Sequence, residues 1–275
     1  MNKISLLFTL IFVLSISSIC FGQTTVESTS TAPEKEKKFS FSINIGNGIP
    51  LGKFSKIETI MLDTVYEKYN LGSGAKIGIG GRVDASYNFG KNIGITAAYY
   101  YSSFGVGKDD YNNLFDSDKL NTSCHTVINE MGRWNVENIL LGVFYQWDKN
   151  KFQFGIKAMA GQQWVKSPEA DVTLNENYQL VGYDPTTTKY YLLLEAMNSK
   201  AFSFAMGGYA KYPLSEKLFL NLAADYIHSN HHFEGNHLKV SDYQNYHGPE
   251  NIVEYVNFDQ TVSFLNIMFG IGISF

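Results

Sequence analysis

The sequence is poor in cysteine, proline and long apolar runs. Its 275 residues include 2 cysteines and 6 prolines, and the long apolar segment near its start runs only from Ile4 to Ile16. A helix needs about 20 apolar residues to span a bilayer, so no transmembrane helix is expected. Charged residues make up 17% of the chain, and the formal net charge is −4. This mild acidity argues against nucleic-acid binding.

The first 22 residues have the pattern of a secretory signal peptide. Lys3 precedes the apolar run, and small residues lead to Gly22, after which we expect cleavage. A lipoprotein signal at Cys20 is the competing interpretation, but Ile19 stands where that signal has a small residue. Cleavage would leave 21 basic and 26 acidic residues and a single cysteine, Cys124, so no intramolecular disulfide is possible. The polar residues 23–38 lack core-forming side chains, which predicts a disordered periplasmic leader.

Aromatic residues and glycine are abundant, with 18 Tyr, 20 Phe and 24 Gly. From Phe39 onward, apolar side chains alternate with small or polar ones, which is the period of a β-strand with one apolar face. Eight segments are strand-like: 39–46, 77–89, 93–102, 133–147, 152–161, 202–212, 218–226 and 265–275. In the fourth segment both faces are apolar beyond Asn138, so its register stays open. The composition and the alternation favour an all-β chain.

The connections between these segments alternate strictly in length. Short turns lie around residues 90–92, 148–150 and 213–216, whereas four connections are long and polar: 49–75, 105–132, 167–199 and 229–256. Up-and-down connectivity then places all short turns at one end, as in transmembrane barrels with periplasmic turns and extracellular loops. Residues 172–181 and 190–197 are also strand-like, so they either extend the walls above a membrane or raise the strand number to ten.

The last strand and the aromatic strand ends point to a lipid-facing barrel. Segment 265–275 carries apolar residues on one face and small or polar ones on the other, and it ends in an aromatic residue. Aromatic side chains also gather at strand ends, as in the girdles of membrane barrels, although a sandwich core is the alternative. They are Tyr87, Phe89, Tyr99, Tyr101, Phe152, Tyr212 and Tyr226.

Residues 39–275 resemble the small outer-membrane β-barrel proteins of Gram-negative bacteria, in the broad porin-like group. The resemblance implies an antiparallel up-and-down transmembrane β-barrel of eight strands, integral to the cell outer membrane. It also implies contact with outer-membrane lipid and lipopolysaccharide, and with the barrel-assembly machinery. In that family a terminal aromatic and alternating apolar residues form the assembly signal; the matching positions here are Phe269, Ile271, Ile273 and Phe275.

The lumen-facing register holds several charged residues, and a lumen of eight strands is just wide enough for side chains to fill it. Because an unpaired buried charge is costly, we expect ion pairs that plug this lumen. The predicted members are Arg82, Asp84, Glu137, Lys157, Lys211 and Asp225, with Arg82 and Lys157 set against Asp84, Glu137 and Asp225. The plug is either structural or part of a narrow pore or transporter for small solutes.

Other chemistry has weaker signals. His228, His231 and His232 lie at the start of the last long connection and could hold zinc, copper or nickel. Ser229 or Ser241 with His228 forms no recognised catalytic motif, so we expect no enzyme and no cofactor. The long loops could bind an extracellular protein or ligand.

Overall fold

The computed structural model describes residues 38–56, 73–90, 92–107, 123–178, 186–242 and 252–275. The predicted signal peptide, nearly all of the predicted leader and the apolar residues 57–66 lie outside these ranges. Within them, no helix is both long and apolar enough to cross a bilayer. All of the described elements belong to one unit, Lys37–Phe275.

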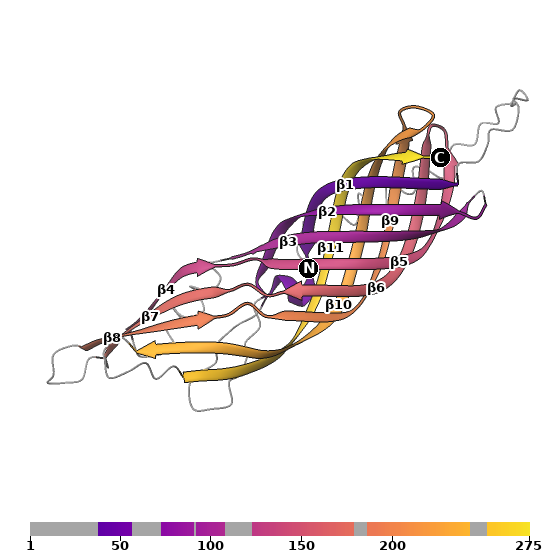
Figure 1. The fold of residues 1–275 in the computed structure, drawn as a ribbon. Coiled ribbons are helices and arrows are strands. Elements are labelled where there is room, and N and C mark those ends of the chain that lie inside the picture. Colours follow the sequence, from indigo (N-terminus) through magenta and orange to yellow (C-terminus); the bar gives the residue numbers. More distant parts are fainter. Residues whose placement is uncertain (1–37, 57–72, 91, 108–122, 179–185, 243–251) are drawn as a thin grey trace, which may run out of the picture. The chain divides into compact units, whose positions relative to one another are not determined.

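The described residues of this unit form eleven strands and one short helix (Figure 1). The first elements are β1 (Phe39–Pro50), the 3₁₀ helix η1 (Gly52–Ser55), β2 (Ala75–Asn88), β3 (Ile93–Val106), β4 (Ser123–Met131) and β5 (Trp134–Lys149). The others are β6 (Phe152–Lys166), β7 (Ala170–Tyr178), β8 (Thr186–Leu194), β9 (Asn198–Pro213), β10 (Leu218–Asp242) and β11 (Ile252–Ser274).

Eight of the strands close into an antiparallel ring. The order is β1-β2-β3-β5-β6-β9-β10-β11, and β11 pairs with both β10 and β1. At the seam, Phe39 N–H donates to Phe275 O at 3.2 Å, and Phe275 N–H donates to Phe39 O at 2.8 Å. The eight strand-like segments of the sequence are the eight strands of this ring, so the predicted all-β barrel and its strand number are confirmed.

The ten-strand alternative is wrong. Strands β7 and β8 pair with each other. Strand β8 pairs with β10 only at Leu238–Asp242, which follows the part of β10 that pairs with β9. Strand β4 then adds to β7. These three strands therefore extend the wall on one side of the ring (Figure 1) and do not enter it. The structure shows the other possibility for the strand-like residues 172–181 and 190–197: they extend the wall of the barrel.

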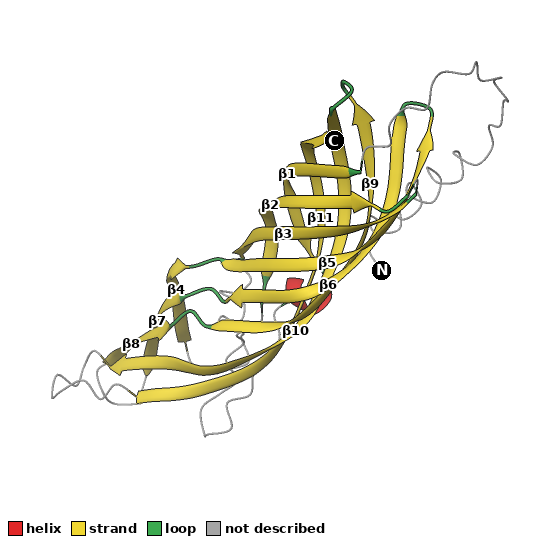
Figure 2. Ribbon diagram, turned by 45° about the vertical axis from the view of Figure 1, so that its right-hand side comes forward, coloured by secondary structure: helices red, strands yellow, loops and turns green. Residues whose placement is uncertain are grey.

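The two ends of the ring differ as the connection lengths predicted. The strand ends joined by the three short connections, together with Phe39 and Phe275, lie at one end, here called the turn end. The strand ends that lead into the long connections lie at the other, the loop end (Figure 2). In the β5–β6 turn, Asn150 has a φ of 58°, a left-handed conformation that asparagine tolerates better than most residues.

Candidate functional site

The centre of the lumen holds a cluster of charged side chains from three strands. Arg82 Nη1 lies 2.6 Å from Asp225 Oδ2, and Lys157 Nζ lies 3.0 Å from Asp225 Oδ1. Arg82 Nε also lies 3.0 Å from Asp84 Oδ2. Since β2, β6 and β10 are not neighbours in the ring, the two contacts of Asp225 cross the lumen. We call Arg82, Asp84, Tyr100, Lys157 and Asp225 the central cluster.

Hydrogen bonds complete the central cluster. Tyr100 on β3 donates its hydroxyl to Asp225 Oδ2 at 3.0 Å. Asp84 accepts from Ser42 Oγ at 2.7 Å and from Asn44 Nδ2 at 3.1 Å. Asp225 is fully buried and Arg82 is 2% exposed. The charges are therefore removed from solvent but paired, which is the condition under which buried ions are tolerated.

The structure brings together four of the six residues predicted to plug the lumen. Glu137 does not face the lumen: it lies exposed on the outer face, where Tyr99 donates its hydroxyl to Oε2 at 3.1 Å. The reason is the register of β5, in which Leu140 and Phe144 point inward and Glu137 shares the outward face of Leu141. Lys211 does point inward but lies nearer the turn end, with Nζ 4.8 Å from the Phe219 ring centre.

A second polar layer lies between the central cluster and the loop end. His231 Nε2 is 2.8 Å from Gln163 Oε1, and its Nδ1 is 3.2 Å from Ser199 Oγ. Gln163 in turn donates to Asn138 Oδ1 at 2.6 Å. Sequence reasoning missed this layer and the hydroxyl of Tyr100. The signal for Tyr100 was available, because the middle of three consecutive tyrosines must face opposite to its neighbours.

The three histidines proposed as metal ligands do not converge. His231 is buried in the lumen, whereas His228 and His232 face outward, as the alternation of side chains along one strand requires. His228 Nδ1 lies 2.7 Å from Ser263 Oγ. His232 lies beyond the apolar part of β10, and its hydrogen bond with Asp259 raises the pKa of the imidazole. Among the described residues, no group of three or more His, Cys, Asp or Glu side chains could hold a metal ion.

Aromatic side chains close the lumen at the loop end. Phe54 on η1, the helix drawn red in Figure 2, is fully buried, with its ring 5.1 Å from Phe104, 5.7 Å from Trp134 and 6.4 Å from Phe264. Trp134 Nε1–H donates to Ser73 O at 2.7 Å, which ties the first long connection to β5. We call Phe54, Phe104, Trp134 and Phe264 the aromatic cap.

Removal of the Phe54 ring is expected to expose Trp134, which is 1% exposed in the intact cap. The chain has 3 tryptophans, so the measurement needs the Trp147→Phe/Trp164→Phe background. We expect Phe54→Ala to raise acrylamide quenching of Trp134 severalfold. Leu51→Ala, at an exposed position in the same connection, is the control and should leave quenching unchanged. Equal quenching in both variants would contradict the cap.

Small residues in the lumen wall make room for large ones opposite, and Gly207 makes room for Asp225. A Cβ at Gly207 would collide with the Asp225 carboxylate, whereas at Gly208 the nearest atom, Gly155 O, would lie 3.5 Å away. Overpacking typically costs about 1–3 kcal/mol, so Gly207→Ala should lower the free energy of unfolding by this amount. Gly208→Ala should not lower it. Urea titration of the refolded protein measures both, and equal losses would contradict the proposed fit.

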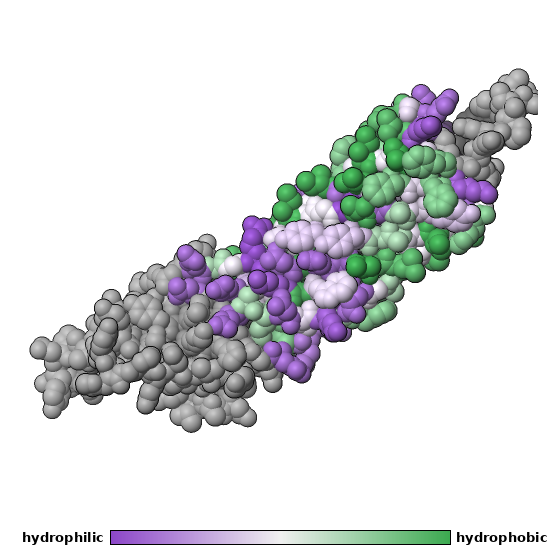
Figure 3. All heavy atoms as spheres, viewed as in Figure 1, coloured by the Kyte–Doolittle hydropathy of each residue, from purple (hydrophilic) through white to green (hydrophobic). Residues whose placement is uncertain are grey.

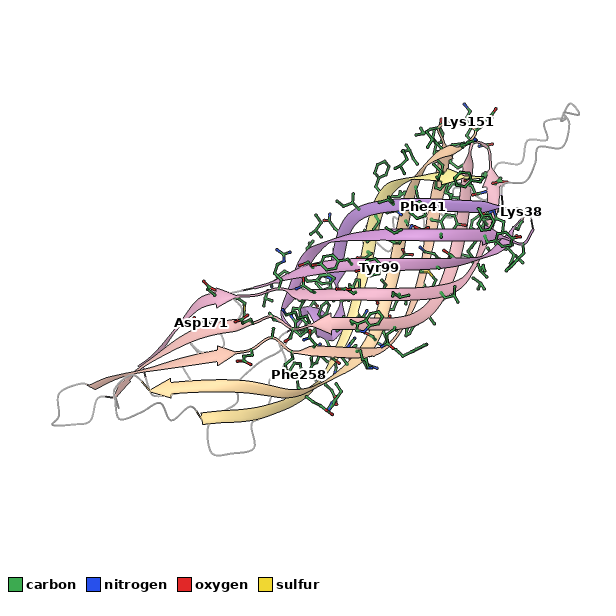
Figure 4. The ribbon with its side chains drawn as sticks, in the orientation of Figure 1. Lys38, Phe41, Tyr99, Lys151, Asp171 and Phe258 are labelled. Carbon is green, nitrogen blue, oxygen red and sulfur yellow. The ribbon has the colours of Figure 1, made fainter. Side chains whose placement is uncertain are left out.

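The outer face of the ring is apolar over a continuous band. Ile43 and Ile45 on β1 and Leu141 on β5 are each more than half exposed. Figure 3 shows the band in green on the turn-end side, and Figure 4 labels Phe41 and Tyr99 on the same outer face. Its further members include Ile79, Val83, Ile139, Val143, Ile156, Phe202, Met206, Leu222, Ile267, Phe269 and Ile271. An apolar exterior and a closed ring without sheet edges are what a bilayer requires.

The chain folds as a transmembrane β-barrel. No family model matches its sequence, and no curated protein does. Solved structures do match. They include Ail, the attachment invasion locus protein of Yersinia pestis, at 11% identity and a TM-score of 0.36, over 87% of this chain and 100% of that one. A major outer membrane protein from Thermus thermophilus matches at 10% identity and a TM-score of 0.39, over 86% and 99%.

A third similar structure is outer membrane protein AlkL in lipid bilayers, at 12% identity and a TM-score of 0.39, over 92% of this chain and 97% of that one. The structural neighbours are thus small outer-membrane β-barrels, the group that the sequence resembles. At these similarities the assignment of the barrel rests on the ring and the apolar band of this chain itself.

Proposed function

We propose that this chain is an integral outer-membrane β-barrel protein of porin-family type, with a filled lumen and a structural or surface-interaction role. The observation that carries the proposal is the central cluster, in which Asp225 binds Arg82 and Lys157 across the lumen. The aromatic cap closes the same lumen a second time, at the loop end. Two closures in series leave no role for a wide pore, and the proposal includes neither catalysis nor a cofactor.

The location in the outer membrane is supported by two independent features. One is the predicted signal peptide, residues 1–22, which would direct export. The other is the barrel itself, because outer membranes hold barrels with short turns at one end and long loops at the other. The partners we propose are outer-membrane lipid, lipopolysaccharide and the barrel-assembly machinery. In this proposal Phe269, Ile271 and Ile273, on the outward face of β11, and Phe275, directly after β11, serve as the assembly signal.

The surface-interaction role is supported by the sheet at the loop end. Strands β4, β7 and β8 extend past the ring, as do the loop-end parts of β10 and β11. The ring is closed by the turn-end parts of β10 and β11 alone. Such an extension would stand outside the bilayer when the apolar band is immersed. It provides the surface on which we place an extracellular protein or ligand.

A narrow pore is the alternative function, and one observation favours it. Several buried polar atoms in the lumen have no hydrogen-bond partner within the described part of the protein: Ser102 Oγ, Asn138 Nδ2 and both amide atoms of Asn266. Buried polar groups of this kind are usually bound to water. A pore that opens would need water in the lumen between the central cluster and the aromatic cap, and these polar atoms could bind it.

Conductance in planar lipid bilayers distinguishes the two functions. We expect the refolded protein to show no large, stable openings, whereas an open porin reconstituted in parallel shows them. Heat-modifiable gel mobility of the same preparation reports whether the barrel is folded, so an absent current cannot be confused with failed folding. Large, stable openings of the unmodified barrel would contradict the filled lumen.

A further inference from the structure

The outer face changes character abruptly at the loop-end edge of the apolar band. One cross-strand row reads Tyr101, Glu137, Trp164 and Lys200, from β3 across β5 and β6 to β9. The next row toward the loop end contains Asn135, Lys166 and Asn198. The row on the opposite side contains Tyr99, Ile139, Gln162 and Phe202, of which Phe202 is 70% exposed. Two lysines and two aromatics therefore stand where the apolar surface ends.

A groove of about 660 Å³ follows these rows. Its lining residues are Tyr101, Asn135, Glu137, Trp164, Val165, Lys166, Asn198, Ser199 and Lys200. Figure 3 shows the pale and purple side chains that border the green band on this side of the ring.

The two lysines of the groove form no salt bridge with a described residue, although the carboxylate of Glu137 also lines the groove. Within the described part of the chain, neither Lys166 nor Lys200 has a carboxylate oxygen within 4.0 Å. The one acidic group in the lining, Glu137, accepts a hydrogen bond from Tyr99. Lys166 opposes Asn198, two residues before Lys200, so the lysines are diagonal neighbours on one face, about 7–8 Å apart at the backbone. One tetrahedral anion can lie between two ammonium groups so spaced.

We infer that this groove binds the phosphate of an anionic glycolipid headgroup, the lipid A part of lipopolysaccharide. Tryptophan and tyrosine favour the boundary between hydrocarbon and water, and lysines just outside the apolar region recognise anionic headgroups. The acyl chains of such a lipid would lie along the exposed side chains of Ile139 and Phe202. The groove is at the loop end, which faces the outer leaflet if the proposed function is right, so this inference rests on that proposal.

Native mass spectrometry of the refolded barrel in detergent tests the inference. The probes are bisphosphorylated lipid A and its dephosphorylated form with the same acyl chains. We expect the unmodified barrel to retain bisphosphorylated lipid A, and Lys166→Gln/Lys200→Gln to retain it at least tenfold less. Lys151→Gln/Lys217→Gln, which alters two exposed lysines at the turn end, is the matched control and should bind like the unmodified barrel. Lys166→Arg/Lys200→Arg should keep binding.

Three results would overturn the inference: equal retention by Lys166→Gln/Lys200→Gln, equal retention of the dephosphorylated lipid, or equal losses in the two lysine-to-glutamine variants. Heat-modifiable mobility and insertion into liposomes are measured on the same samples. A barrel that inserts but shows no lysine-dependent lipid binding refutes the groove alone. A protein that does not insert refutes the proposed function.

Discussion

Asp225→Ala is expected to destabilise the barrel by about 3–5 kcal/mol, the usual cost of removing one partner from a buried ion pair. The substitution leaves Arg82 and Lys157 facing each other in the lumen without the carboxylate that both contact. Tyr100 also loses its acceptor. Arg82 keeps its contact with Asp84, so the penalty comes mainly from Lys157, which becomes a buried cation without a carboxylate partner.

Unfolding of the vesicle-refolded protein in guanidinium chloride, followed by tryptophan fluorescence, measures this loss. Asp259→Ala is the control, because Asp259 is an exposed carboxylate that also pairs with a basic side chain, His232, and it should change stability little. Asp225→Ala/Lys157→Met should be more stable than Asp225→Ala alone, since one unpaired cation is gone. Equal losses for Asp225→Ala and Asp259→Ala would show that the central cluster does not stabilise the lumen.

Leu141→Arg is expected to lower stability in lipid by about 2–4 kcal/mol, the cost of a charged residue on the lipid face near the bilayer midplane. Leu141 is 64% exposed, so no protein side chain needs to move to accept the arginine. In a soluble sandwich or barrel, an exposed leucine could be replaced by arginine at little cost. The substitution therefore tests whether hydrocarbon covers the apolar band.

The measurement is the same guanidinium chloride titration, carried out on the protein refolded in lipid vesicles. Asn230→Arg provides the control, because Asn230 is exposed on β10 beyond the apolar band and accepts a hydrogen bond there from Thr261. It should change stability by much less than Leu141→Arg. If both arginines have the same small effect, the apolar band does not lie in the hydrocarbon.

The ring could be predicted from sequence because most of its strands carry their own local signal. In β11, apolar residues such as Ile271 alternate with small or polar ones such as Gly272. One face of the strand contacts lipid and the other faces the lumen, so the alternation with period two is visible in the sequence. The alternation of short and long connections then sets the direction of every strand. The alternation within strands and the alternation of connection lengths are both local features of the sequence. They predict the ring without knowledge of long-range contacts.

The wrong placement of Glu137 shows where that logic fails. In β5 the lumen side is filled by Val136, Leu140 and Phe144, while Ile139 and Leu141 face outward. When both faces are apolar, the period-two signal disappears and the register cannot be chosen from the strand alone. The neighbouring strand decides it, because Tyr101 and Glu137 lie opposite each other in the ladder and face the same side.

The aromatic cap could not be predicted from the sequence, and the wall extension could be predicted only as one of two alternatives, for a different reason. Phe54 contacts aromatic rings from three strands, β3, β5 and β11, and β8 pairs with β10 rather than with β9, the next strand in the sequence. Nothing in the local pattern around Phe54 distinguishes a buried ring from an ordinary loop residue. The strand propensity of residues 190–197 was visible in the sequence, but its pairing partner was not.

The seam between β1 and β11 has a consequence for synthesis and folding. Phe39 and Phe275, at opposite ends of the described polypeptide, share two backbone hydrogen bonds. Until the final segment has left the ribosome, the remaining strands form at most an open ribbon with two unsatisfied margins. Such margins pair readily with other chains, and contacts so remote in sequence form slowly. Copies of the chain whose β11 has not yet paired with β1 are therefore expected to associate with one another through these margins.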